Sequence, residues 1–199
     1  MKSFFNWSKL SGYKGIIYFG VLLLATHYLW NFVVDGYVDG DDVSIFGKDM
    51  SGTFHSISVF TTKVCYHFMK LFPNTDTFTM EGTLLYFTDG KIKLNIIGGC
   101  SSIKQIYIFI IIILFYYGPA KHKLWYIPVG AFLLFAFNII RICSICVLTK
   151  NHPERFGFLH DELFRYLFYG LIFLLWVIWE EKYAKGNKAV TKQKASESH

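Results

Sequence analysis

Four long apolar stretches alternate with short polar segments along this chain. They cover residues 16–34, 102–117, 125–148 and 160–179. A run of roughly 18 predominantly apolar residues is long enough to cross a bilayer as a helix, and each stretch approaches or passes that length. The pattern therefore predicts an all-α polytopic membrane protein with about four transmembrane helices.

Residues 53–72 show a different, two-sided pattern. Phe54, Ile57 and Val64 recur near helical spacing on one side, whereas Lys63 falls on the other. A fifth span here would bury Lys63 in hydrocarbon, which is costly. We therefore expect an interfacial amphipathic helix that lies along the outer membrane surface.

Residues 78–97 alternate between apolar and polar positions with the period of a strand. On this pattern Met80, Leu84 and Tyr86 share one face, Thr79, Thr83 and Leu85 share the other, and Asp89-Gly90 is a strong turn signal. Unpaired strand edges are not tolerated in lipid. The segment is thus interpreted as a small extracytoplasmic β-hairpin above the membrane.

Composition and charge refine this topology. The chain is 53% hydrophobic and only 17% charged, which is unusual for a soluble domain. Lysines concentrate in residues 1–14, 118–123 and 182–194, whereas residues 35–51 form an acidic, glycine-rich loop with five aspartates. The positive-inside rule then places both termini in the cytoplasm, and topology explains the basic tail better than nucleic-acid binding does. Residues 1–182 are expected to form one membrane-embedded domain, followed by a basic, disordered cytoplasmic tail at 183–199.

The run Gly98-Gly99-Cys100-Ser101-Ser102 leads directly into the second apolar stretch. This arrangement predicts that Cys100 lies in the first turn of a membrane helix, where the unpaired N–H groups would lower the pKa of the thiol. Ser101 is an expected supporting residue. The alternative is that Cys100 is a small buried hydrophobe.

Arg141 lies inside the third apolar stretch, about two turns from its outer end. Such an arginine can simply snorkel to the interface, but an ionisable residue at membrane depth is by default a functional candidate. Asn138 precedes Arg141 by three positions, shares its helix face and could orient the guanidinium.

His160 opens the last apolar stretch and is followed by Asp161-Glu162. It could serve only as a helix cap. A position at a helix N-terminus would instead disfavour the imidazolium form and leave a neutral base at the depth of Cys100. The competing histidines are His55, His67 and His152.

Cys100, His160 and Arg141 would supply a nucleophile, a base and a cation for an oxyanion, the parts of covalent acyl transfer. The sequence also contains Cys143-Ser-Ile-Cys146, a C-x-x-C spacing that is a redox motif in soluble folds. Two thiols in an apolar helix are more often packing residues.

These residues resemble the exosortase/archaeosortase family over residues 92–179, and most resemble its short F-type branch. The resemblance rests on a Gly/Cys/Ser run entering a span, an Asn-x-x-Arg-Ile in the next and a histidine opening the last. It implies a multi-pass protein of the bacterial inner membrane. It also implies cleavage of C-terminal sorting signals, membrane-anchored segments of exported proteins, by a cysteine transpeptidase facing the periplasm or exterior.

By position, the resemblance implies that Cys100 is the nucleophile, Arg141 stabilises the oxyanion and His160 is the general base. The common family motif reads Glu-Cys-Ser-Gly, whereas this chain has Gly99-Cys100-Ser101-Ser102.

Two other functions stay open from the sequence. One is a quinone-linked membrane thiol oxidoreductase that uses Cys143 and Cys146, with Cys100 and Cys65 as a second pair. The other is a non-enzymatic membrane assembly subunit. No metal-ligand cluster or nucleotide-binding loop is visible, so no cofactor is expected.

Overall fold

A computed structural model describes residues 14–36, 43–73, 75–91 and 93–184. The N-terminal lead-in and most of the predicted tail therefore lie outside the described residues. The α-helices are α1 (Lys14–Val33), α2 (Ser51–Met69), α3 (Ile103–Phe115), α4 (Ala120–Thr149) and α5 (Phe164–Trp179). Single turns are η2 (Gly98–Cys100) and η3 (Pro153–Arg155), with π-helical turns η4 (Phe158–Leu163) and η5 (Glu180–Ala184).

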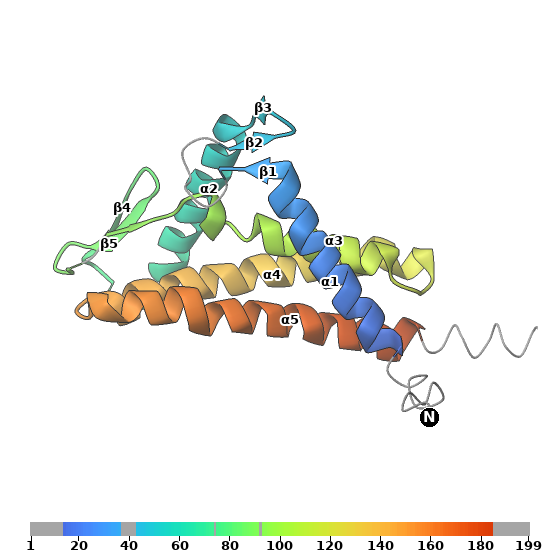
Figure 1. Cartoon of the computed structure of the whole chain (residues 1–199). Coiled ribbons are helices and arrows are strands. Elements are labelled where there is room, and N and C mark those ends of the chain that lie inside the picture. Colours follow the sequence, from blue (N-terminus) through green and yellow to red (C-terminus); the bar gives the residue numbers. More distant parts are fainter. Residues whose placement is uncertain (1–13, 37–42, 74, 92, 185–199) are drawn as a thin grey trace, which may run out of the picture.

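Helices α3, α4 and α5 run along one another, and α1 crosses them obliquely (Figure 1). The apolar α3 packs against α1, α4 and α5, and its four buried positions are each 0% exposed: Ile108, Phe109, Ile112 and Ile113. They join a core with α5 that includes Phe168, Ile172 and Trp176. Burial of these apolar side chains stabilises the contact between α3 and α5.

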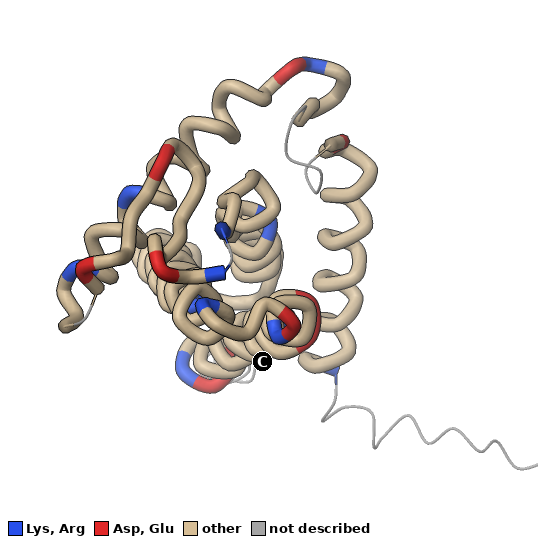
Figure 2. The backbone as a smooth tube through the Cα atoms, turned by 90° about the vertical axis from the view of Figure 1, so that its left-hand side faces the viewer, with Lys and Arg blue, Asp and Glu red and all other residues tan. Residues whose placement is uncertain are grey.

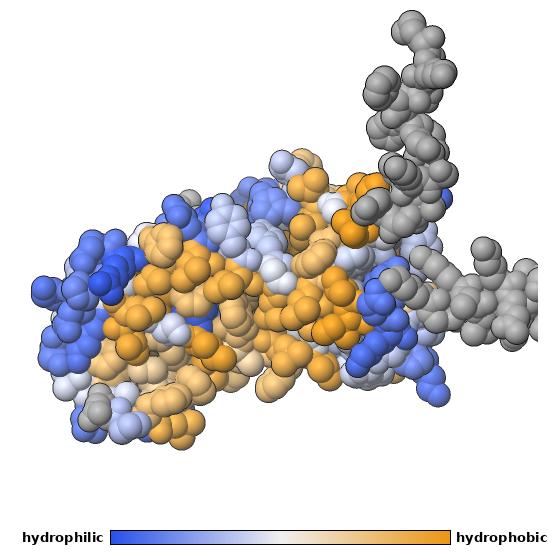
Figure 3. Space-filling model, turned by 90° about the horizontal axis from the view of Figure 1, so that it is seen from below, coloured by the Kyte–Doolittle hydropathy of each residue, from blue (hydrophilic) through white to orange (hydrophobic). Residues whose placement is uncertain are grey.

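Three helical segments are long and apolar enough to cross a membrane: Lys14–Val33, Ala120–Thr149 and Pro153–Ala184. The remaining predicted span, at residues 102–117, contains α3, which has only 13 residues. At 1.5 Å per residue it is roughly 20 Å long, shorter than the hydrocarbon core. The surface seen from below has an apolar band between two hydrophilic ends (Figure 3). A polytopic membrane protein is thus supported, whereas the number of spans stays a prediction.

Helix α2 has 19 residues, but it is not among the segments apolar enough to cross a membrane. Its Lys63 is exposed, in accord with the expected polar side. Thr62, which belongs to the predicted polar side, is nevertheless 0% exposed. The nearby Cys65 joins the core beneath the sheet. Its interfacial placement stays a prediction.

The predicted hairpin is a three-stranded antiparallel sheet of β4 (Phe78–Glu81), β5 (Leu84–Phe87) and β6 (Lys93–Asn95). The sequence interpretation missed the turn at Gly82, where φ is +60°. This turn pairs Met80 with Leu85 and Leu85 with Leu94, so these three share a face. The predicted faces were therefore wrong on β5, where Leu85 is buried and Leu84 lies on the opposite side.

The expected turn at Asp89-Gly90 links β5 to β6 and fastens the sheet to the end of α4. Lys150 Nζ lies 2.8 Å from Asp89 Oδ2, and this hydrogen bond lowers the pKa of the exposed Asp89 carboxyl. The backbone N–H of Lys91 also donates to the carbonyl of Lys150 at 2.9 Å. The sheet is thereby held at the end of the bundle where α4 leads into α5.

The loop expected at residues 35–51 contains a second small antiparallel sheet within its described part. Its strands are β1 (Val34–Asp35), β2 (Ser44–Ile45) and β3 (Lys48–Asp49). Figure 2 looks at the molecule from the end that carries β4 and β5, and acidic and basic positions gather in its loops and turns. The long helices behind them are mostly uncharged.

The contact between α3 and α4 offers a test of this packing. A Cβ on Gly130 would lie 2.2 Å from Cζ of the fully buried Phe109. Gly130→Ala should therefore destabilise the bundle by about 1–3 kcal/mol, despite the higher helix propensity of alanine. Gly170→Ala in α5 is the matched control, because nothing lies within 4 Å of its Cβ position. Thermal unfolding in detergent would measure both, and equal stability of the two variants would contradict the packing.

Candidate active site

Cys100 is the last residue of the η2 turn, which joins the sheet to α3. Its backbone N–H donates to the Ile97 carbonyl at 2.9 Å. Ser101 is buried, and its hydroxyl donates to the Gly98 carbonyl at 2.5 Å. Ser102 then adopts a left-handed backbone with φ of +59°. That residue separates η2 from α3, so the expectation that Cys100 lies in the first turn of the membrane helix was wrong.

The environment of the thiol also differs from the expected one. Burial raises the pKa of Cys100, while the Arg141 charge and a hydrogen bond with the Ile97 backbone act in the opposite direction. The lowered pKa that a helix N-terminus predicted for the Cys100 thiol is therefore wrong. A group whose pKa is raised above its ordinary value is a neutral thiol at pH 7, so attack by this sulfur needs a base beside it.

The side chain that lies beside the Cys100 thiol is His160. Its Nε2 lies 3.9 Å from Cys100 Sγ, although 60 residues separate the two in sequence. The ring stacks on Phe156 with centroids 5.1 Å apart and an interplanar angle of 14°. The third contact joins His160 Nδ1 to Asp161 Oδ1 at 3.0 Å. Both nitrogens and one ring face of the imidazole are thus engaged.

His160 does not open its helix, contrary to the expectation from sequence. The helical segment begins at Pro153, and His160 lies in the π-helical turn η4. There the N–H of Phe164 bonds to the carbonyl of Leu159, five residues back. In an α-helix this N–H would bond to the carbonyl of His160. Turns of this kind are frequent at functional sites.

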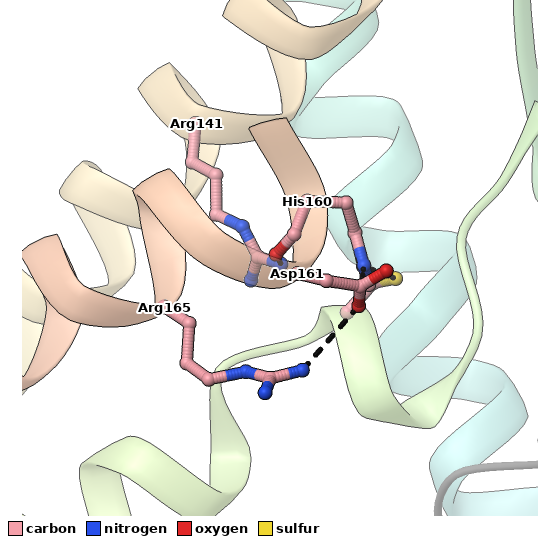
Figure 4. A network of polar contacts seen from close by, with 5 residues as sticks. Arg141, His160, Asp161 and Arg165 are labelled. Carbon is pink, nitrogen blue, oxygen red and sulfur yellow. Dashed lines mark hydrogen bonds and ion pairs between the residues drawn. The ribbon is translucent and has the colours of Figure 1, made fainter. Parts of the chain in front are cut away.

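Arg141 points inward from α4 and is only 7% exposed. Its Nη2 donates to the carbonyl of His160 at 3.4 Å, and its guanidinium lies over the Phe168 ring at 5.6 Å. Figure 4 shows Arg141, His160 and Asp161 converging from neighbouring helices. A buried guanidinium in these contacts does not fit a snorkelling side chain.

Asn138 is 0% exposed, but it binds a different partner from the one expected. Its Nδ2 donates to the carbonyl of Cys100 at 2.7 Å. The expectation that Asn138 orients Arg141 is not what the contacts show. One amide from α4 instead fixes the backbone of the cysteine turn, and Arg141 on the same helix faces His160.

The competing histidines lie elsewhere. His55 and His67 are exposed on α2, and His152 is exposed with its Nδ1 2.8 Å from Glu154 Oε1. The structure thus brings together Cys100, Arg141 and His160, and their catalytic roles stay a prediction. Within the described residues, no cluster of three or more His, Cys, Asp or Glu side chains could hold a metal ion.

The remaining thiols form a separate buried group. Cys65, Cys143 and Cys146 are each less than 5% exposed, and Cys143 Sγ donates to the Cys65 carbonyl at 3.7 Å. All four cysteines are free. Cys65 therefore lies beside Cys143 on α4, and the Cys100–Cys65 pair required by the oxidoreductase hypothesis does not receive support.

The sequence interpretation overlooked Asp161 as a site residue. There Asp161 was only one of the two acidic residues that follow His160. The available signal was the adjacent His-Asp pair at residues 160–161. In the structure both residues lie in the π-turn η4, and the carboxylate oxygen contacts the ring nitrogen.

Comparison with known proteins adds one finding. A sequence family described as transmembrane exosortase matches residues 53–179, well over half of the chain. This match includes most of α2, the β4–β6 sheet and every residue of the candidate site. No curated protein and no solved structure matches the chain.

Proposed function

The chain belongs to the transmembrane exosortase family, and on this basis we propose that it is a membrane cysteine peptidase or transpeptidase. Its substrates are exported proteins that end in a membrane-anchored C-terminal sorting signal. The observation that carries the proposal is the 3.9 Å approach of Cys100 Sγ to His160 Nε2, with the buried Arg141 beside them. A nucleophile, a base and a cation are the components that acyl transfer requires.

The first step transfers a proton and forms a bond. As Cys100 Sγ attacks the scissile carbonyl carbon, its proton passes to His160 Nε2. The electrons of the C=O bond move to oxygen, and the Arg141 guanidinium stabilises the resulting oxyanion. The raised pKa of the thiol favours this concerted use of His160 over a preformed thiolate.

The second step releases the C-terminal fragment. The C=O bond re-forms, the C–N bond breaks and His160 gives its proton to the leaving amine. An amine, a hydroxyl or water then attacks the remaining thioester and loses its proton to His160. The C–S bond breaks, and the proton passes from His160 to sulfur, which restores the Cys100 thiol. These steps require no cofactor.

The proposed topology places this chemistry at the outer surface of the bacterial inner membrane. The basic connection at residues 118–123 joins α3 to α4 at one end of the bundle, and the site lies toward the end that carries the sheet (Figure 1). By the positive-inside rule the basic end is cytoplasmic. The substrate helix would then enter laterally from the bilayer, which leaves its scissile bond near the level of Cys100.

The other cysteines separate this proposal from the oxidoreductase hypothesis. Cys143→Ala combined with Cys146→Ala should leave processing within about twofold of wild type, because both side chains are buried packing residues of α4. The assay is the ratio of precursor to mature substrate on a gel, alongside the abundance of the enzyme. Loss of processing in a stable, well-expressed double variant would instead favour thiol oxidoreduction.

A further inference from the structure

The His160 ring has two nitrogens with different partners. Nε2 faces Cys100 Sγ at 3.9 Å, and Nδ1 faces Asp161 Oδ1 at 3.0 Å. A carboxylate only accepts hydrogen bonds. The short Nδ1 contact therefore favours a proton on Nδ1 and a lone pair on Nε2, which is the form that can accept the thiol proton.

From this geometry we infer that Asp161 is the positioning residue of the site: it fixes the tautomer and orientation of His160. This role rests on the proposed function, in which His160 is the base. Asp161 lies beyond the Cys–Arg–His set and touches the imidazole only through Nδ1. It would also stabilise the imidazolium that forms when His160 holds the thiol proton, as a third group does in other nucleophile–base pairs.

The surrounding contacts hold this arrangement in place. The Phe156 ring stacks on the imidazole at 14° and restricts its rotation. Arg165 Nη2 lies 3.4 Å from the same Asp161 oxygen that faces the histidine. Figure 4 shows the Asp161 carboxylate between the Arg165 side chain and the His160 ring.

The backbone of His160 is held in place as well as its ring, and the π-turn is part of this second arrangement. Its register takes the Phe164 N–H to the Leu159 carbonyl, and the His160 carbonyl receives Arg141 Nη2 at 3.4 Å. Backbone and ring of His160 are therefore held separately, by Arg141 and Asp161. Loss of the carboxylate should disturb the ring while the backbone contact persists.

Asp161→Asn is the most informative variant. It keeps the size of the side chain, but its amide can donate to Nδ1 and so favour the Nε2–H tautomer, which has no lone pair for the thiol. NMR of the full-length protein with ¹⁵N-labelled histidine distinguishes the tautomers by their nitrogen shifts and couplings. The wild type should show His160 protonated on Nδ1, and Asp161→Asn should shift it toward Nε2. An unchanged tautomer would overturn the inference.

The effect of Asp161→Asn on kcat is measured with the same gel assay and the wild-type substrate. Because Asp161 is 55% exposed and water can partly replace its carboxylate, kcat should fall about ten- to a hundredfold, with KM unchanged. The matched control is Glu162→Gln, which removes the neighbouring exposed carboxylate and should keep wild-type kcat. A general loss of folding would lower the abundance of the enzyme instead of changing kcat alone.

The two readouts separate failure of this inference from failure of the proposed function. If wild type processes substrate and Asp161→Asn does so at the same kcat, the positioning role is wrong and the peptidase function stands. If His160 changes tautomer as expected but wild type does not process any C-terminal signal, the positioning holds and the peptidase function is wrong.

Discussion

Cys100→Ala is expected to abolish processing of the C-terminal sorting signal. In the proposed mechanism the Cys100 sulfur is the attacking atom, and removing the nucleophile of a comparable triad costs roughly 10⁶-fold in kcat. Mature product should therefore fall below detection while the precursor accumulates. The fold should survive, because Asn138 binds the backbone carbonyl of Cys100 and does not depend on its side chain.

Cys100→Ser refines this expectation. A hydroxyl is a poorer nucleophile than a thiol at neutral pH, and His160 must remove a far less acidic proton. We expect Cys100→Ser to be nearly as inactive as the alanine variant. The assay compares precursor and mature substrate at equal enzyme abundance, with Cys146→Ala as the control for loss of a buried thiol. Substantial processing by Cys100→Ala would rule out covalent catalysis at this residue and favour a non-enzymatic assembly role.

The membrane-spanning character was readable from the sequence because hydrocarbon imposes a simple rule. Residues 125–148 and 16–34 are apolar over a length that only a membrane or a large core would bury, and α4 and α1 cover them. The pairing of Cys100 with His160 was also within reach, since both flank apolar runs whose order brings their ends together. Both features could be predicted from the distribution of apolar stretches along the whole chain.

The errors arose where a single residue changes the local backbone. Gly82 turns the chain inside the predicted first strand and reverses which side chains of β5 face the core. Ser102 adopts a left-handed backbone and separates Cys100 from α3. Neither change alters hydropathy, so periodicity alone did not reveal them.

The environment of the site was harder still to predict. The lowered thiol pKa expected for Cys100 depended on its being in a helix terminus, whereas burial raises that pKa. The role of Asp161 depends on the π-turn at residues 158–163, which propensity does not predict. Asn138 shares its helix with Arg141, yet its partner is the Cys100 carbonyl 38 residues away in sequence.

Arg141→Lys should fold and insert normally but lose most of its processing activity. Lysine keeps the positive charge and a long apolar stem, so a snorkelling role would tolerate it. An oxyanion inside the bundle needs the planar, multiply donating guanidinium, and a lysine in this buried position loses its proton more readily. Loss of one oxyanion donor costs on the order of 10²–10³-fold in kcat.

The matched control for this change is Arg155→Lys. Arg155 is exposed in η3, which lies between α4 and the π-turn of His160 in the chain. It should process substrate like wild type. The measurement is the initial rate of mature product formation at saturating substrate, with the amount of membrane-inserted enzyme determined in parallel. Because Arg141 also binds the His160 carbonyl, NMR of the labelled histidines would report whether that ring has moved. Wild-type rates in Arg141→Lys would show that the charge is structural, and Arg141 would then have to be removed from the candidate site.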